Sequence, residues 1–128
     1  MSELTCLELG VLLWLVHLFV TVGVAQVALP LPWLLSSRDT GMAPKGVYFG
    51  RAERAQANYL ANFVPFVALD LAFIALHFSA GVWPTVWIAA RALYIPLYLF
   101  NVTTVRSLVW GVSLVAIVMM LVRLLGAA

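Results

Sequence analysis

The chain has 128 residues, of which 65% are hydrophobic and 9% are charged, and its formal net charge is +2. A mean hydropathy of +1.07 excludes an ordinary soluble domain. The basic residues form no extended patch, so nucleic-acid binding is not indicated. The single cysteine, Cys6, excludes an intrachain disulfide framework.

Four apolar runs of roughly 20 residues, the length that spans a bilayer, follow one another along the chain. We expect helices at about Leu4–Leu29, Ala57–Phe78, Val82–Phe100 and Val105–Leu125. Too few residues remain outside these runs to build a second domain. The sequence therefore predicts one all-α domain over residues 1–128, an integral membrane four-helix bundle.

The charged loop residues predict the orientation of this bundle. The segment Ser36–Gly50, together with Arg51 and Arg54, holds four of the seven basic residues. Basic loops stay in the cytoplasm, so we expect this loop inside and both termini outside. The Ser79–Gly81 turn then also lies outside, and the Asn101–Arg106 connection returns to the cytoplasmic side.

The segment from 51 to 66 is the one place where charge runs directly into a long apolar stretch. On a helix, Arg51, Arg54, Asn58 and Asn62 share one face. Such a row is suited to holding a carboxylate or another small anion, because guanidinium forks match carboxylates. The alternative interpretation is that the arginines anchor the helix at the headgroups and the amides bond neighbouring helices.

The third helix carries a second polar face, formed by Arg91, Tyr94, Tyr98 and Asn101. Tyr98 is expected near the cytoplasmic end, level with the amides of the second helix. The tyrosines either form an interfacial aromatic belt or, because they share a face with Arg91, line a cleft within the protein.

The fourth helix is expected to begin with Thr104 as its N-cap, which leaves Arg106 in the first turn beside Ser107. A cation there opposes the helix dipole, whereas an anion bound between Arg106 and the helix end is favourable. Beyond Ser107 the helix is expected to act as a packing element. Three spans thus bring polar groups to the cytoplasmic mouth, which favours an anion site there.

Two charged residues lie inside predicted spans. Counting from the outer helix ends places Asp70 and Arg91 at similar depth, and buried charges in a bilayer are costly unless they are paired. We therefore predict an Asp70–Arg91 ion pair between adjacent helices or between subunits. An alternative interpretation uses this pair as the pathway of a small transporter subunit. No metal site is expected, because His17 and His77 are the only histidines.

Taken together, these motifs resemble the MAPEG family, the membrane-associated proteins of eicosanoid and glutathione metabolism. The second-helix segment Arg51-x-x-Arg54-Ala-x-x-Asn58-x-x-x-Asn62-x-x-Pro65-Phe66 carries the resemblance most specifically. Arg91-x-x-Tyr94-x-x-x-Tyr98 and Arg106-Ser107 match the third- and fourth-helix motifs in order and spacing. The resemblance implies a homotrimer that binds glutathione between its subunits on the cytoplasmic side.

The resemblance also implies roles for particular residues. Those expected to bind glutathione are Arg54, Asn58, Asn62 and Tyr98, with Arg38 reaching a neighbouring subunit's site. Arg106 and Ser107 are the residues expected to act in catalysis, Arg106 by stabilising the thiolate that attacks a lipophilic electrophile.

The chain departs from the family pattern at Gln56, Ala57, Ala61 and Tyr94, and the departure at Ala61 bears most directly on glutathione. The family usually has a glutamate that binds the glutathione amino group where this chain has Ala61. An ammonium group in a low-dielectric site needs a partner. Two interpretations therefore stay open: a glutathione-dependent transferase or peroxidase, and a non-catalytic protein of the same fold that has lost glutathione binding.

Overall fold

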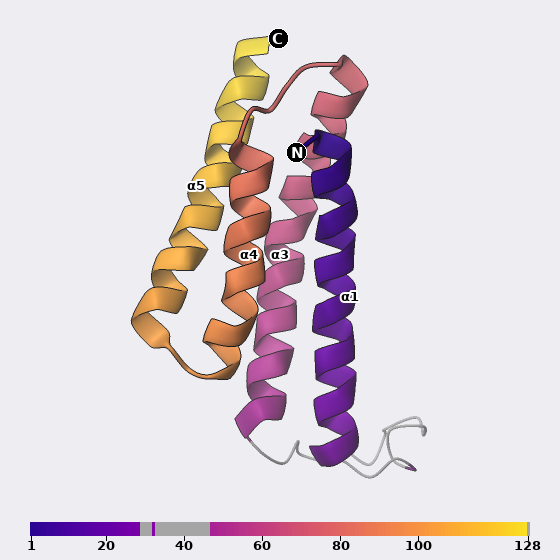
Figure 1. Ribbon diagram of the computed structural model, residues 1–128, viewed down its shortest axis with the longest axis vertical. Helices are drawn as coiled ribbons and strands as arrows, with labels where there is room; N and C mark the ends of the chain where they lie inside the picture. The colour runs from indigo at the N-terminus through magenta and orange to yellow at the C-terminus, as the bar shows by residue number, and fades with distance from the viewer. Residues whose placement is uncertain (29–31, 33–46, 128) are drawn as a thin grey trace.

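The computed structural model describes residues 1–28, 32 and 47–127. Within these residues the chain forms four helices and no strand: α1 (Glu3–Ala28), α3 (Val47–Leu76), α4 (Trp83–Leu99) and α5 (Thr103–Ala127) (Figure 1). Helix α1 packs against α3, α4 packs closely along α5, and contacts between α3 and α4 join the two pairs. The all-α prediction is confirmed.

The predicted boundaries need two corrections. Helix α3 begins at Val47, well before the apolar run, so the last residues of the expected Ser36–Gly50 loop are helical and the rest of that loop lies outside the described residues. Helix α5 begins at Thr103, and the amide of Arg106 already donates to the carbonyl of Val102 at 3.0 Å. Thr104 therefore lies inside the first turn and is not the N-cap.

Helix α3 ends in a left-handed residue that closes the last turn. His77 has φ of +52°, its amide donates to Ile74, and the amide of Phe78 reaches back to the carbonyl of Phe73. These two bonds form a Schellman motif, and the ring contact between Phe73 and Phe78 (5.9 Å) is the apolar contact that accompanies it. The motif stops the helix and turns the chain toward α4.

Helix α4 ends in the same way. Asn101 has φ of +58°, its amide donates to Tyr98 at 3.2 Å, and the amide of Val102 donates to Leu97 at 2.9 Å. Asparagine tolerates this conformation better than most residues, which suits it to the position. The tight reversal sets the first turn of α5, with Arg106, directly beside the end of α4.

His77→Gly is expected to stabilise the protein. A left-handed backbone strains a residue that has a Cβ, and glycine relieves that strain, so we expect a gain of about 1 kcal/mol. Thermal unfolding in detergent measures the change. Ala68→Gly, at an exposed position in the middle of the same helix, is the matched control and should lower stability by about 1 kcal/mol. Destabilisation by both substitutions would contradict the argument.

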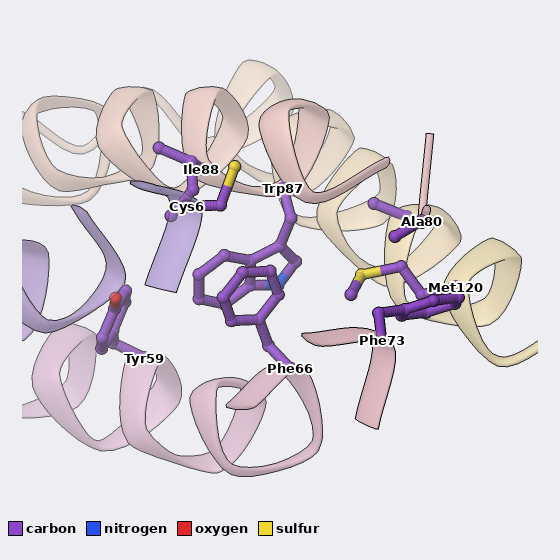
Figure 2. Close-up of a cluster of buried hydrophobic side chains, with 9 residues drawn as sticks. Cys6, Tyr59, Phe66, Phe73, Ala80, Trp87, Ile88 and Met120 are labelled. Carbon is purple, nitrogen blue, oxygen red and sulfur yellow. The ribbon is translucent and has the colours of Figure 1, made fainter. Parts of the chain in front are cut away.

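An aromatic cluster holds α1, α3 and α4 together (Figure 2). Trp87 stacks on Phe66 with ring centroids 4.0 Å apart, and Tyr59 and Phe63 lie within 5.7 Å and 6.1 Å of the same indole. The hydroxyl of Tyr59 donates to the carbonyl of Gly10 across the α1–α3 contact. Since Gly10 has no side chain, the rings of α3 approach α1 closely.

The first and last described turns lie at one end of the bundle, beside the α3–α4 connection (Figure 1). The carboxylate of Glu3 accepts a hydrogen bond from the amide of Ala80 at 2.8 Å, and the guanidinium of Arg123 donates to the carbonyl of Ser79 at 3.1 Å. The start of α3 and the α4–α5 connection lie at the opposite end.

The predicted Asp70–Arg91 ion pair is wrong. Trp87 stacks on Phe66, and from that level Arg91 lies one turn toward one end while Asp70 lies one turn toward the other, an offset of about 12 Å. Both side chains are fully enclosed by their own chain, which also keeps them from a partner subunit. Arg91 donates instead to Asn58, and neither oxygen of Asp70 has a hydrogen-bond partner among the described residues.

The error has a geometric cause. Counting residues from the helix ends assumes that α3 and α4 end and begin at the same height. Figure 1 shows that the connection descends from the end of α3, so that α4 starts deeper in the bundle. Every residue of α4 is therefore displaced toward the start of α3, which brings the side chain of Arg91 within reach of Asn58.

Candidate functional site

A pocket of about 160 Å³ opens near the end of the bundle where α4 reverses into α5. Three helices contribute to it: its described lining is Asn58 of α3, Tyr94 and Tyr98 of α4, and Arg106, Ser107 and Trp110 of α5. Each set follows helical spacing, because Tyr94 and Tyr98 are one turn apart and Trp110 follows Arg106 by one turn. The Schellman turn at Asn101 brings the α4 and α5 residues together.

Tyr98 contacts two arginines, one through its hydroxyl and one through its ring face. The Nε of Arg54, from α3, donates to its hydroxyl at 3.1 Å, and the guanidinium of Arg106, from α5, lies 4.7 Å from the ring centroid. The π face of an aromatic ring attracts a cation, so the ring fixes Arg106 without neutralising it. The mouth of the pocket therefore carries two positive charges.

A buried arginine, Arg91, contacts the inner wall of the pocket from behind. Arg91 is fully enclosed, its Nη2 donates to the side-chain oxygen of Asn58 at 2.9 Å, and its guanidinium lies 4.4 Å from the ring centroid of Tyr94. Asn58 and Tyr94 both line the pocket, so Arg91 supports two of its walls from behind. The Nε and Nη1 of Arg91 have no hydrogen-bond partner among the described residues.

A comparison with protein families matches residues 6–126 to the model of the MAPEG family. The chain belongs to the MAPEG family. No curated protein and no solved structure shows a match.

MAPEG membership agrees with the helices of the structure. Among the described residues, Glu3–Val24, Gly50–Leu76 and Thr103–Ala127 are each long and apolar enough to cross a bilayer. Helix α4, with 17 residues, is shorter. Large apolar side chains cover the outside of the helices, as a bilayer requires; Phe19, for example, is 68% exposed. The protein is an integral membrane protein.

The residues that the MAPEG motifs single out differ in their relation to the pocket. Those that line the pocket are Asn58, Tyr98, Arg106 and Ser107. Arg54 contacts the pocket through Tyr98. Asn62 is not part of the described lining: its amide donates to the carbonyl of Asn58 in the preceding turn at 2.9 Å. Arg38 lies outside the described residues.

Trp110 is the pocket residue that sequence reasoning missed. It lies in the part of α5 that was expected to serve only for packing, yet it lines the pocket with Arg106 and Ser107. The signal was present, because position 110 follows 106 and 107 by four and three residues and so shares their face of the helix. The spacing was overlooked because the residues around Trp110 are apolar, which indicated a helix that serves only for packing.

Proposed function

We propose that this MAPEG protein is a glutathione-dependent transferase or peroxidase that acts on lipophilic electrophiles. The observation that supports the proposal is the meeting of Asn58, Tyr98 and Arg106, from three different helices, at one pocket. The family motifs assign glutathione binding to Asn58 and Tyr98, and stabilisation of the glutathione thiolate to Arg106. Arginine, amide and hydroxyl groups together suit the carboxylates and the thiolate of such a ligand.

The proposed chemistry rests on Arg106. The thiolate, and not the thiol, is the nucleophile, and a nearby guanidinium favours its formation. In an addition to an activated double bond, the thiol releases its proton, the thiolate forms a carbon–sulfur bond, and the resulting carbanion takes up a proton. Ser107, in the next position of the same helix, lines the same pocket. Its hydroxyl donates to the carbonyl of Thr103 at 3.1 Å, so a hydrogen bond from it to the sulfur requires the hydroxyl to turn away from that carbonyl.

The arrangement in the membrane is part of the proposal. Helix α4 rises about 25 Å, enough to serve as a fourth span in a locally thinned bilayer. The basic loop then places the pocket on the cytoplasmic side, both termini outside, and the reactive group within reach of bilayer-dissolved substrates. A homotrimer would bring a neighbouring subunit, with its Arg38, to complete the glutathione site.

A second candidate is a non-catalytic MAPEG protein that has lost glutathione binding. Ala61 favours it, because this exposed residue lies one turn from Asn58 at the position where the family usually has a glutamate. A methyl group there cannot pair with the amino group of glutathione.

Equilibrium binding of glutathione to the purified protein in detergent tests the proposal. The native protein should bind saturably, and Arg106→Ala should weaken binding at least about tenfold, since hydrogen bonds to charged groups contribute about 1.5–3 kcal/mol. Arg123→Ala is the matched control, because this exposed arginine lies on the same helix at the other end of the bundle. It should leave binding unchanged.

The result also separates the two candidates. Binding only after Ala61→Glu would favour the non-catalytic protein, whose scaffold remains while its cofactor site is lost. If neither the native protein nor Ala61→Glu binds glutathione, the result would contradict a role for glutathione.

A further inference from the structure

The buried bond between Arg91 and Asn58 determines which part of the asparagine amide is free to meet a ligand. The side-chain oxygen of Asn58 accepts from Nη2 of Arg91 at 2.9 Å. Because the oxygen and nitrogen of an amide lie at opposite corners of one plane, the nitrogen is the polar atom left to act on the pocket. Asn58 therefore presents hydrogen-bond donors to a ligand.

The buried charge behind the pocket is positive, so it favours an anionic ligand as the donors of Asn58 do. Arg91 is fully enclosed, and two of its three nitrogens have no hydrogen-bond partner in the part of the chain that the structure describes. The ring faces of Tyr94, at 4.4 Å, and Tyr59, at 5.4 Å, stabilise this cation but do not neutralise it. Its field acts through a low-dielectric interior and is weakly screened.

The mouth adds two further guanidinium groups, those of Arg54 and Arg106. The described lining consists of an amide, two phenols, a serine hydroxyl, an indole and one guanidinium, and it includes no carboxylate. Every charged group that the described residues bring to the pocket is thus positive. Such a site attracts anionic groups and repels an ammonium group.

We propose that Arg91, by fixing Asn58 as a donor, makes this pocket selective for an anionic thiol whose amino group is absent or acylated. The inference rests on the proposed function and names the class of thiol within it. Arg91 acts as a positioning residue, because it reaches the ligand through Asn58 and through its field. Glutathione itself carries an ammonium group, so it should bind more weakly than an otherwise identical thiol that lacks this group.

The test compares two ligands that differ only in that group: glutathione and its des-amino analogue, glutaryl-cysteinyl-glycine. Equilibrium binding to the purified full-length protein in detergent should be at least about tenfold tighter for the analogue. Arg91→Gln should reduce this ratio toward one, because it removes the charge. A purely structural role of Arg91 would instead weaken both ligands equally and leave the ratio unchanged, which would overturn the proposal.

Asn58→Asp provides a second variant that does not depend on removing the buried cation. A carboxylate at this position keeps the bond to Arg91 and partly neutralises it, so the fold is retained and the ratio should again fall toward one. Arg123→Gln, far from the pocket, should keep the ratio of the native protein.

The outcomes separate this inference from the proposed function. If the native protein binds both ligands equally, or binds glutathione more tightly, the selectivity is overturned while the thiol-binding function stands. If it binds neither ligand, both the function and the selectivity are overturned. A preference for the analogue that Arg91→Gln and Asn58→Asp both reduce would establish the assignment.

Discussion

Trp87→Ala should lower the stability of the protein by about 3–5 kcal/mol, the largest loss that we expect from one core substitution. The indole is fully enclosed and lies at the centre of the aromatic cluster, stacked on Phe66 at 4.0 Å with an interplanar angle of 9° (Figure 2). Inside a bilayer, helices associate largely through such close packing, because lipid is as apolar as the side chains. Removing the ring leaves a cavity among α1, α3 and α4 that these helices can fill only in part.

Thermal or SDS-induced unfolding in detergent, followed by circular dichroism, measures this loss. Phe19→Ala is the matched control, since its ring is 68% exposed on α1 and should contribute little to packing within the chain. A loss from Phe19→Ala as large as that from Trp87→Ala would contradict the assignment of the core to the aromatic cluster.

Asp70→Asn is expected to stabilise the protein by about 1–3 kcal/mol. The carboxyl group is fully enclosed in α3, and neither oxygen has a hydrogen-bond partner among the described residues. A buried polar group without a partner destabilises the fold, and the penalty is larger for an ionisable group than for a neutral amide of the same shape. The native residue therefore lowers stability, and its isosteric amide should recover part of that loss.

The same unfolding assay provides the measurement. Glu53→Gln, an exposed carboxylate to amide change on the same helix, should alter stability by less than about 0.5 kcal/mol. A clear loss of stability in Asp70→Asn would mean that the carboxyl group makes a stabilising interaction that the amide cannot replace, and this explanation would then fail.

Much of the fold could be predicted because a bilayer demands long, continuous apolar helices. The expected third helix, Val82–Phe100, differs by one residue at each end from α4. The start of α3 was placed too late, because the polar turns before Ala57 are helical but are not apolar. Hydropathy detects the buried part of a helix, whereas the helix itself continues beyond it.

The candidate site was predictable to the extent that helical spacing determines it. Positions 54 and 58 share a face of α3, and Tyr98 and Arg106 are brought together by the short connection between α4 and α5. The behaviour of Asn62 was not predictable from spacing, because an amide on a helix can bond to the carbonyl four residues earlier instead of facing a neighbour.

The partner of Arg91 could not be derived from sequence either. Its depth depends on how far the connection between α3 and α4 descends, and the hydropathy pattern contains no information on that height. The expected partner, Asp70, and the observed one, Asn58, lie about three helical turns apart on α3.

The first turn of α1 and the last turn of α5 lie at the same end of the bundle, away from Arg106 (Figure 1). Copies of the chain can therefore be joined head to tail by linkers that never cross the bilayer and never approach the pocket. Such concatemers test the proposed homotrimer, because a three-copy fusion would then supply all of its subunits in one polypeptide. In that fusion Arg106→Ala can be introduced into one, two or all three copies to reveal whether each pocket works alone.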